Sequence, residues 1–363
     1  MLTLKDSEKS PLPKKYRSIN NLCAVIYDQF TSVVSDSHFL KHYTVEFPID
    51  PANQKFVSEF NAGDVHALDF LKENGLNGEL TEILTKHIYF SIIADFANFM
   101  YESLSCAQRG KMAVAYALLR KPLTDELLIL EQLLTDSTNF IDLYFHLGDP
   151  KLYDPSRANL DRRQIIQNVF KKSRPLSAFD SDTVFALRYD KEAATGINGI
   201  TNHALHIVTN HKAYPTDNQS FNFIFSVKED YKRYWEHYYQ FVPYLLIYAA
   251  HVVDELVFSW MPEYSALKTV RSFQRLIGIL NLVYPKNLKK NREKLAKDLN
   301  AIATELNGPC EQCGSLNTFQ EADFVLFFNQ QLLLCPYCFH NHLFSSSFLD
   351  RIDLILDTVH GKR

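Results

Sequence analysis

Two Cys-x-x-Cys pairs near the carboxyl end constrain this 363-residue chain more than any other feature of its sequence. They contain four of the six cysteines, and 21 residues separate the pairs. Two such pairs supply the four thiolates of a tetrahedral structural zinc site, in which each metal–sulfur distance is about 2.3 Å. The spacing predicts one structural zinc ion per chain, bound by Cys310, Cys313, Cys335 and Cys338.

The residues around the pairs predict the shape of this metal-binding module. Gly314 follows the first pair and Pro336 lies within the second, and both suit the tight turn of a metal-binding knuckle. Between the pairs, residues 323–328 (DFVLFF) and 331–335 (QLLLC) resemble the two strands of a β-hairpin. Two knuckles and a hairpin make a zinc ribbon, which we expect over residues 305–345.

Other interpretations of the cysteines fit the sequence less well. A redox Cys-x-x-Cys pair opens a helix that follows a strand, and neither pair has that setting. His340 and His342 follow the last cysteine and are candidate ligands. Four thiolates already close the coordination shell, so we expect both histidines to lie outside it and the metal to be structural.

The rest of the chain is predicted to be mainly α-helical. Hydrophobic residues make up 46% of it and aromatic residues 13%, which is enough for a large core, whereas only 11 glycines are present. The expected parts are a loose N-terminal arm (1–16), a helical body (17–304) with a small α+β insert at about 177–228, the ribbon (305–345) and a C-terminal helix (346–363). Within the insert, residues 183–190 and 221–227 alternate as strands do.

The sequence predicts a cytoplasmic protein. Residues 1–15 lack the apolar segment of a signal peptide, and the most apolar stretch, 241–253, is too short to cross a bilayer. In the cytoplasm, paired cysteines indicate metal binding before disulfide bonds.

A basic helix precedes the ribbon. Its six cations are Lys286, Lys289, Lys290, Arg292, Lys294 and Lys297. They form either a stripe that contacts nucleic-acid phosphates or an ordinary solvated helix face, and the net charge of −4 for the whole chain favours the second. The predicted partner of the ribbon and this helix is a protein or a nucleic acid.

Three histidines form a second candidate site. His203, His206 and His211 lie within nine residues, and the first two share a helix face. They either form a metal or catalytic cluster of a hydrolase or pack as ordinary histidines among aromatic residues.

A histidine and two carboxylates lie on a strongly apolar helix. Asp254 and Glu255 follow His251 at helical spacing. A buried charge has to be paired, so a structural ion pair is the favoured interpretation, with an acid–base or metal pair as the alternative.

Arg120 ends an apolar helix and precedes several acids. We expect a buried ion pair with Glu126 or Glu131, and the alternative is an arginine that binds phosphate or carboxylate. The chain has no phosphate-binding G-x-x-x-x-G-K-[ST] loop, no G-x-G-x-x-G, no G-x-S-x-G and no H-E-x-x-H motif.

Residues 99–134 (FMYESLSCAQRGKMAVAYALLRKPLTDELLILEQLL) resemble the helical core of uncharacterised bacterial proteins grouped near the abortive-infection families. In that group a helix rich in small residues ends in an arginine, and a glutamate follows in the next helix. The matching positions here are Arg120 and either Glu126 or Glu131. The resemblance implies a bacterial protein with a role in phage defence.

A second resemblance is to the compact helical ribonucleases of bacterial toxins, which place an arginine and a histidine four to six residues apart on one helix. Arg233 and His237 are the matching residues, with three residues between them. The two function classes that we expect are therefore a zinc-ribbon interaction protein and a metal-independent ribonuclease, with a hydrolase that uses the histidine cluster as a third.

Overall fold

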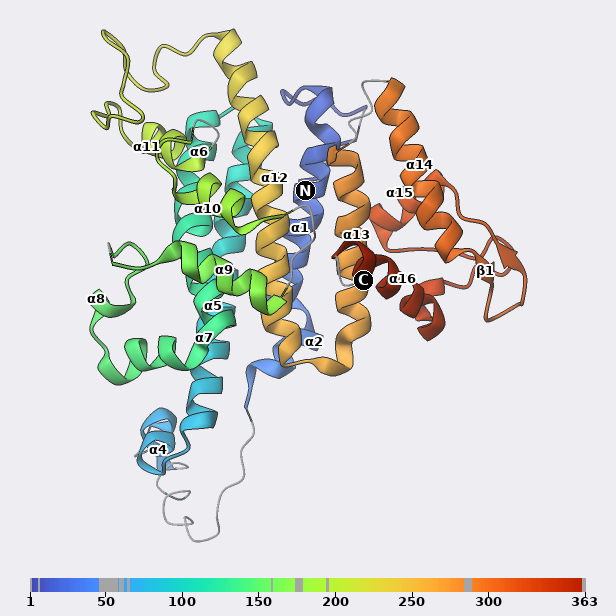
Figure 1. Cartoon of the computed structure of the whole chain (residues 1–363), viewed down its shortest axis with the longest axis horizontal. Coiled ribbons are helices and arrows are strands. Elements are labelled where there is room, and N and C mark those ends of the chain that lie inside the picture. Colours follow the sequence, from blue (N-terminus) through green and yellow to red (C-terminus); the bar gives the residue numbers. More distant parts are fainter. Residues whose placement is uncertain are drawn as a thin grey trace.

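The computed structural model describes residues 2–5, 7–45, 58, 62–63, 66–157, 159–173, 179–193, 196–283 and 289–360. This part of the chain is mainly α-helical and carries a small antiparallel sheet near the carboxyl end, which confirms the predicted fold class (Figure 1). The helices are α1 (Arg17–Ser35), α2 (Ser37–Leu40), α4 (Ala67–Glu73), α5 (Asn77–Gln108), α6 (Met112–Arg120), α7 (Leu127–Ile141), α8 (Pro150–Tyr153), α9 (Arg162–Ser173), α10 (Ser181–Tyr189), α11 (Ile197–Leu205), α12 (Lys228–Ser259), α13 (Ser265–Val283), α14 (Lys289–Leu306), α15 (Glu321–Gln330) and α16 (Ser346–Val359). The strands are β1 (Gly308–Pro309) and β2 (Leu316–Asn317), and short 3₁₀ or π segments are η1 (Lys14–Tyr16), η2 (Lys41–Tyr43), η4 (Lys121–Glu126), η5 (Asp142–Leu147), η6 (Pro262–Tyr264) and η7 (His342–Phe344).

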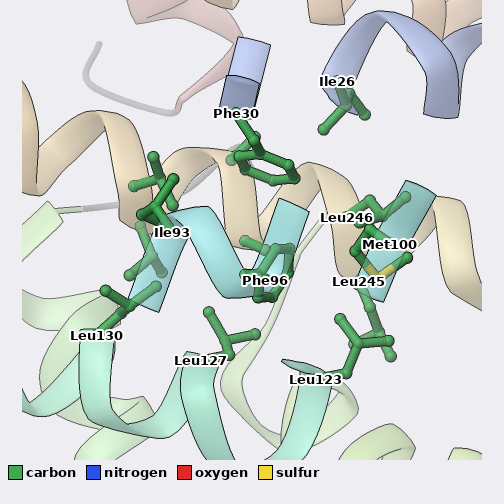
Figure 2. Packing of buried hydrophobic residues seen from close by; sticks show 14 of the residues in the cluster. Ile26, Phe30, Ile93, Phe96, Met100, Leu123, Leu127, Leu130, Leu245 and Leu246 are labelled. Carbon is green, nitrogen blue, oxygen red and sulfur yellow. The ribbon is translucent and has the colours of Figure 1, made fainter. Parts of the chain in front are cut away.

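A large core fills the space between α1, α5, α7 and α12 (Figure 1). Phe30 of α1 meets Phe96 of α5 edge to face, with ring centroids 5.1 Å apart. Leu127 of α7 and Leu245 of α12 close the same cluster from two other sides (Figure 2). Full burial of each such side chain contributes roughly 1.5–3 kcal/mol, so this cluster dominates the stability of the helical body.

The central helix α12 has 32 residues and extends well beyond the apolar stretch 241–253, so by length and composition alone it could cross a membrane. However, 78% of its most apolar segment is buried inside the protein. The core helix of a soluble protein can be equally long and apolar, so this feature is weak evidence for a membrane span.

A second core lies under the cysteine pairs. It combines Phe273 of α13, Leu299 of α14, Phe327 of α15 and Ile352 of α16, all of them buried. Helix α13 stands between the two cores (Figure 1). Gly278 permits this arrangement, because a Cβ atom there would lie 2.3 Å from the Leu22 side chain of α1.

The prediction that residues 1–16 form a loose arm is wrong, because N-terminal residues pack on the helical body. Leu2, Leu4 and Leu12 are buried, although the described residues before η1 form no helix or strand. Asn20 donates a hydrogen bond to the Leu2 carbonyl, and Asn21 both donates to and accepts from the Leu4 backbone. These two amides therefore hold the arm.

The predicted α+β insert contains no strand among its described residues. Residues 183–190 lie mostly in helix α10, and residues 221–227 form turns without strand pairing. In α10, Val184 and Leu187 are buried three positions apart, and Asp180 caps the helix by accepting a hydrogen bond from the Thr183 N–H. The helical spacing and the cap outweigh the short alternation of polar and apolar side chains.

Candidate metal centre

The four cysteines predicted as metal ligands come together in space. Their sulfur atoms all lie within 4.8 Å of one another. The Cys310 and Cys338 sulfurs are 3.7 Å apart, and so are those of Cys313 and Cys335. Four sulfurs at about 2.3 Å from a tetrahedral metal ion lie about 3.8 Å from one another, so this group fits a single ion.

The first knuckle is built on the short sheet. Strands β1 and β2 pair antiparallel, with Gly308 opposite Asn317. Between them the Cys310 N–H donates to the Ser315 carbonyl at 2.9 Å, and the Gly314 N–H donates to the Cys310 carbonyl at 2.7 Å. Gly314 has a φ of +71°, which a residue without Cβ adopts at little cost.

The second knuckle repeats this geometry with a different residue at the turn. The Cys335 N–H donates to the His340 carbonyl and the Phe339 N–H to the Cys335 carbonyl, both at 2.9 Å. Leu334 forms an antiparallel bridge with Asn341 below the loop. Phe339 stands where the first knuckle has its glycine and has a φ of +58°. A phenylalanine in this region is uncommon because its Cβ crowds the backbone.

The predicted hairpin between the pairs is wrong. Residues 321–330 form helix α15, whose first turn has a capping box between Gln320 and Asp323. Phe324 and Phe327 are buried at helical spacing, and Gln331 ends the helix in the left-handed conformation. The β structure of the module is instead the pair β1–β2, which flanks the first knuckle.

Side chains around the cysteines hold the module on the second core. Cys310 and Cys335 are buried, Cys338 is half-buried and Cys313 is exposed. Hydrogen bonds from Ser315 lower the pKa of the Cys313 thiol to about 6.

Arg351 of α16 connects the module to the helix before it. Its guanidinium donates to the carbonyls of Leu306 and Asn307, at the end of α14, at 3.1 Å each.

The two neighbouring histidines are separate from the group of sulfurs. Among the described residues, the four cysteines are the group of possible ligands that lie close enough to share a metal ion, and neither histidine belongs to it. His342 is buried and stacks on Phe348, with ring centroids 5.1 Å apart. His340 contributes its backbone carbonyl to the second knuckle.

The basic helix forms as predicted and precedes the module. Lys289 begins α14, whereas Lys286 lies outside the described residues. The cations Lys290, Arg292, Lys294 and Lys297 are exposed, and Leu295 and Leu299 on the other side of the helix are buried. The structure thus gives a solvated basic face, and its binding of phosphates stays a prediction.

Two of the three histidines of the second candidate site contact the same residue, Tyr214, and the third is exposed. His203 Nε2 donates to the Tyr214 carbonyl at 2.8 Å, and the ring of His211 stacks on that of Tyr214 at 4.4 Å. His206 is exposed at the end of α11. These contacts are those of histidines that order a turn.

The residues matched to the ribonuclease pattern also face different surroundings. The side chain of Arg233 is 79% exposed and forms an ion pair with Asp230. His237 is half-buried, and its Nδ1 lies 3.0 Å from the Tyr116 hydroxyl. A ribonuclease function for this pair stays a prediction.

The prediction that Arg120 forms a buried ion pair with Glu126 or Glu131 is wrong. Glu131 pairs with Arg188 at 2.5 Å, and Glu126 pairs with Lys121 at 3.2 Å. Arg120 is exposed and donates a long hydrogen bond of 3.4 Å to Asn202.

The buried ion pair expected near His251 is confirmed, with arginines as partners. Asp254 is buried and lies 2.8 Å from Arg271 and 2.6 Å from Arg275, both on α13. His251 bonds to Ser173 at 3.0 Å, and burial lowers the pKa of this histidine to about 3. It is therefore neutral at physiological pH.

Sequence reasoning missed a carboxyl pair where α5 meets η4. Burial, then the neighbouring Asp95 carboxyl, raises the pKa of Glu126 to about 8, while a hydrogen bond from Glu126 lowers the pKa of Asp95. Lys121 lies beside both carboxyls. Asp95 lies one helix away from the other two residues, so no local pattern could have identified the group.

Glu126→Gln is expected to remove a pH dependence of stability. Because the pKa of Glu126 is raised from 4.5 to about 8, its contribution to stability is present below about pH 4.5 and is lost as the pH rises through about 8. At pH 9 the variant should be more stable than the wild type by at least about 1 kcal/mol, and at pH 5 the difference should be small. Urea unfolding at both pH values measures this, and the exposed Glu102→Gln serves as control. A constant difference between variant and wild type would contradict the assignment.

Comparison with known proteins gives no relative for this chain. No family model, no curated protein and no solved structure matches it.

Proposed function

We propose that this protein is a cytoplasmic interaction protein whose ribbon is closed by one structural zinc ion and presents a surface to a protein partner. Because α14 extends to Leu306, the ribbon is taken from here on as residues 308–345. The observation that carries the proposal is the convergence of four sulfur atoms within 4.8 Å. Its defence role stays a prediction from the resemblance of residues 99–134.

Zinc suits this donor set and a structural role. Thiolates are soft ligands, and a tetrahedral group of four sulfurs is typical of zinc or iron. Four protein ligands leave no position for water or substrate, so the bound ion would crosslink the two knuckles. The long sequence between the pairs would then be fixed at both ends, with α15 packed on the second core.

Among the described residues, the four large apolar side chains with the highest exposed fractions all lie on the ribbon. Leu316, Tyr337, Phe339 and Phe344 are between 67% and 83% exposed. Tyr337 lies inside the second Cys-x-x-Cys loop, and Phe339 is the first residue after that loop. Large apolar residues that stay exposed next to a rigid fold are typical of binding surfaces, in which aromatic side chains contribute most of the affinity.

Phe339 gives this argument an energetic basis. A side chain in the left-handed region costs roughly 1–2 kcal/mol, and the Phe339 ring, 74% exposed, regains little by burial. Glycine would suit this turn better, as Gly314 does in the first knuckle. A phenylalanine here weakens folding, which is consistent with a role in binding.

The charge around the ribbon indicates the class of partner. The ribbon itself contains three acids, Glu311, Glu321 and Asp323, and no lysine or arginine, and a zinc ion with four thiolates adds two further negative charges. Such a surface repels phosphates. It fits a protein whose apolar pocket has a basic rim, because charge complementarity steers association. A nucleic acid would have to use the basic face of α14 instead.

A photo-reactive amino acid in place of Tyr337 tests the partner. Illumination in cells is expected to join it to a protein, whereas the same amino acid in place of Leu354, exposed on α16, should not form that product. The identified protein is then purified and its affinity measured. Phe339→Gly should weaken binding by about tenfold or more while leaving the ribbon as stable as before or more stable by up to about 1 kcal/mol.

The same experiment separates the other partner classes. A crosslink to nucleic acid or to a second copy of this chain would contradict the proposed partner. Equal binding by the Phe339→Gly variant, with its metal content intact, would contradict the proposed surface.

A further inference from the structure

An open groove of about 710 Å³ is lined by residues between Arg120 and Asn202, which are distant in sequence from the ribbon. Its walls are the end of α6, the π segment η4, the start of α9 with the residues just before it, and helices α10 and α11. Figure 1 shows these helices on the side of the molecule away from the ribbon. The volume is within the range of small-molecule sites, about 300–1,000 Å³.

The groove is richer in cations than in anions, although the whole chain is acidic. Four cationic side chains line it, Arg120, Arg162, Arg163 and Lys191, together with the carboxylates Asp125 and Asp161. The whole chain has a net charge of −4. A cationic hollow on such a protein attracts anions locally.

Two of these cations are held in place, and two can turn towards a ligand. Arg162 donates to the Pro155 carbonyl at 2.7 Å and Arg163 pairs with Asp182. Arg120 is exposed with the long hydrogen bond to Asn202, and Lys191 is exposed.

The floor of the groove is fixed by a buried polar network. Arg188 is fully buried and donates to the Leu123 carbonyl at 2.7 Å, to Glu131 at 2.5 Å and to the Tyr189 hydroxyl at 2.8 Å. The Tyr189 hydroxyl donates in turn to the Thr124 carbonyl at 2.6 Å. This network ties α10 to η4, and a π segment inside a helical region frequently marks a functional site.

We propose that this groove binds a nucleoside phosphate, a ligand independent of the zinc ribbon. Arg120 and Lys191 would bind the phosphates. The planar guanidinium of Arg163, 4.2 Å above the ring of Phe185, offers a flat surface on which a base can stack. The half-buried carboxylate of Asp125 accepts hydrogen bonds, which suits the ribose hydroxyls.

Calorimetric titration of the full-length protein with ATP, GTP, CTP and UTP tests this proposal, with adenosine and pyrophosphate as partial ligands. At least one triphosphate is expected to bind saturably, one per chain, whereas adenosine should not bind and pyrophosphate should bind more weakly. The double variant Arg120→Ala/Lys191→Ala should lose about tenfold or more in affinity. The matched control Lys171→Ala/Lys172→Ala removes the same charge from the exposed end of α9, outside the groove, and should bind as the wild type does.

Three results would overturn the proposal. They are the absence of saturable binding by all four triphosphates at about 1 mM, equal weakening in both double variants, and pyrophosphate binding as tight as that of the best triphosphate.

Discussion

Replacing Cys335 by serine is expected to abolish metal binding and to unfold the ribbon together with much of the second core. Structural zinc contributes on the order of 10 kcal/mol to folding, which is comparable to the stability of an entire domain. Besides the metal, residues 308–319 and 332–342 are supported by two short strands, one bridge, knuckle hydrogen bonds and the packing of Phe319, Leu333 and His342 on the second core. Hydrogen exchange should accelerate in residues 308–345 and in α15, while α5, α7 and α12 stay protected.

A matched control separates loss of the metal from loss of a buried thiol. Cys23 is buried in the large core, away from the four clustered sulfurs. Cys23→Ala should leave the metal content and the exchange of the ribbon unchanged and should cost at most about 2 kcal/mol. Slow exchange of the ribbon in the Cys335→Ser variant would contradict a structural role for the metal.

Replacing Asp254 by alanine is expected to destabilise the whole protein by about 3–5 kcal/mol, because it leaves two buried arginines unpaired. Arg271 and Arg275 are each at most 4% exposed. They also reach α1, where Arg271 donates to the Gln29 carbonyl and Arg275 to the Gln29 side chain. The carboxylate therefore fixes α13 to α12 and α1, on the side of α13 that faces the large core. Denaturant unfolding followed by circular dichroism measures the effect.

The adjacent glutamate provides the control. Glu255 pairs with Lys268 at 2.8 Å, with the lysine side chain about a third exposed. Ion pairs of this kind contribute up to about 1 kcal/mol, so Glu255→Ala should have a small effect. Similar losses in the two variants would contradict the structural role of Asp254.

The features that could be predicted from the sequence are those encoded locally. The cysteine pairs can be predicted because each pair is fixed by a spacing of three residues, and α14 because its apolar residues recur at helical spacing. The same local signals are present in α10 and α15. Val184 with Leu187, and Phe324 with Phe327, stand three residues apart behind capping residues. In both segments helical spacing and the cap determine the structure, and the resemblance to a strand does not.

The features that could not be predicted depend on partners distant in sequence. Glu131 pairs with Arg188, and Asp254 pairs with arginines of the next helix. The Asp95 carboxyl of α5 lies beside the Glu126 carboxyl of η4. The sequence shows that a buried charge needs a partner, but not which one. The cationic groove is a larger case, since its walls come from five separate elements.

The metal content of the purified protein tests the central claim most directly. Elemental analysis of full-length protein, purified under reducing conditions without chelator, should give one zinc ion per chain, and the Cys335→Ser variant should contain none. Protein that is folded, with a protected ribbon, yet holds no tightly bound zinc would contradict the account.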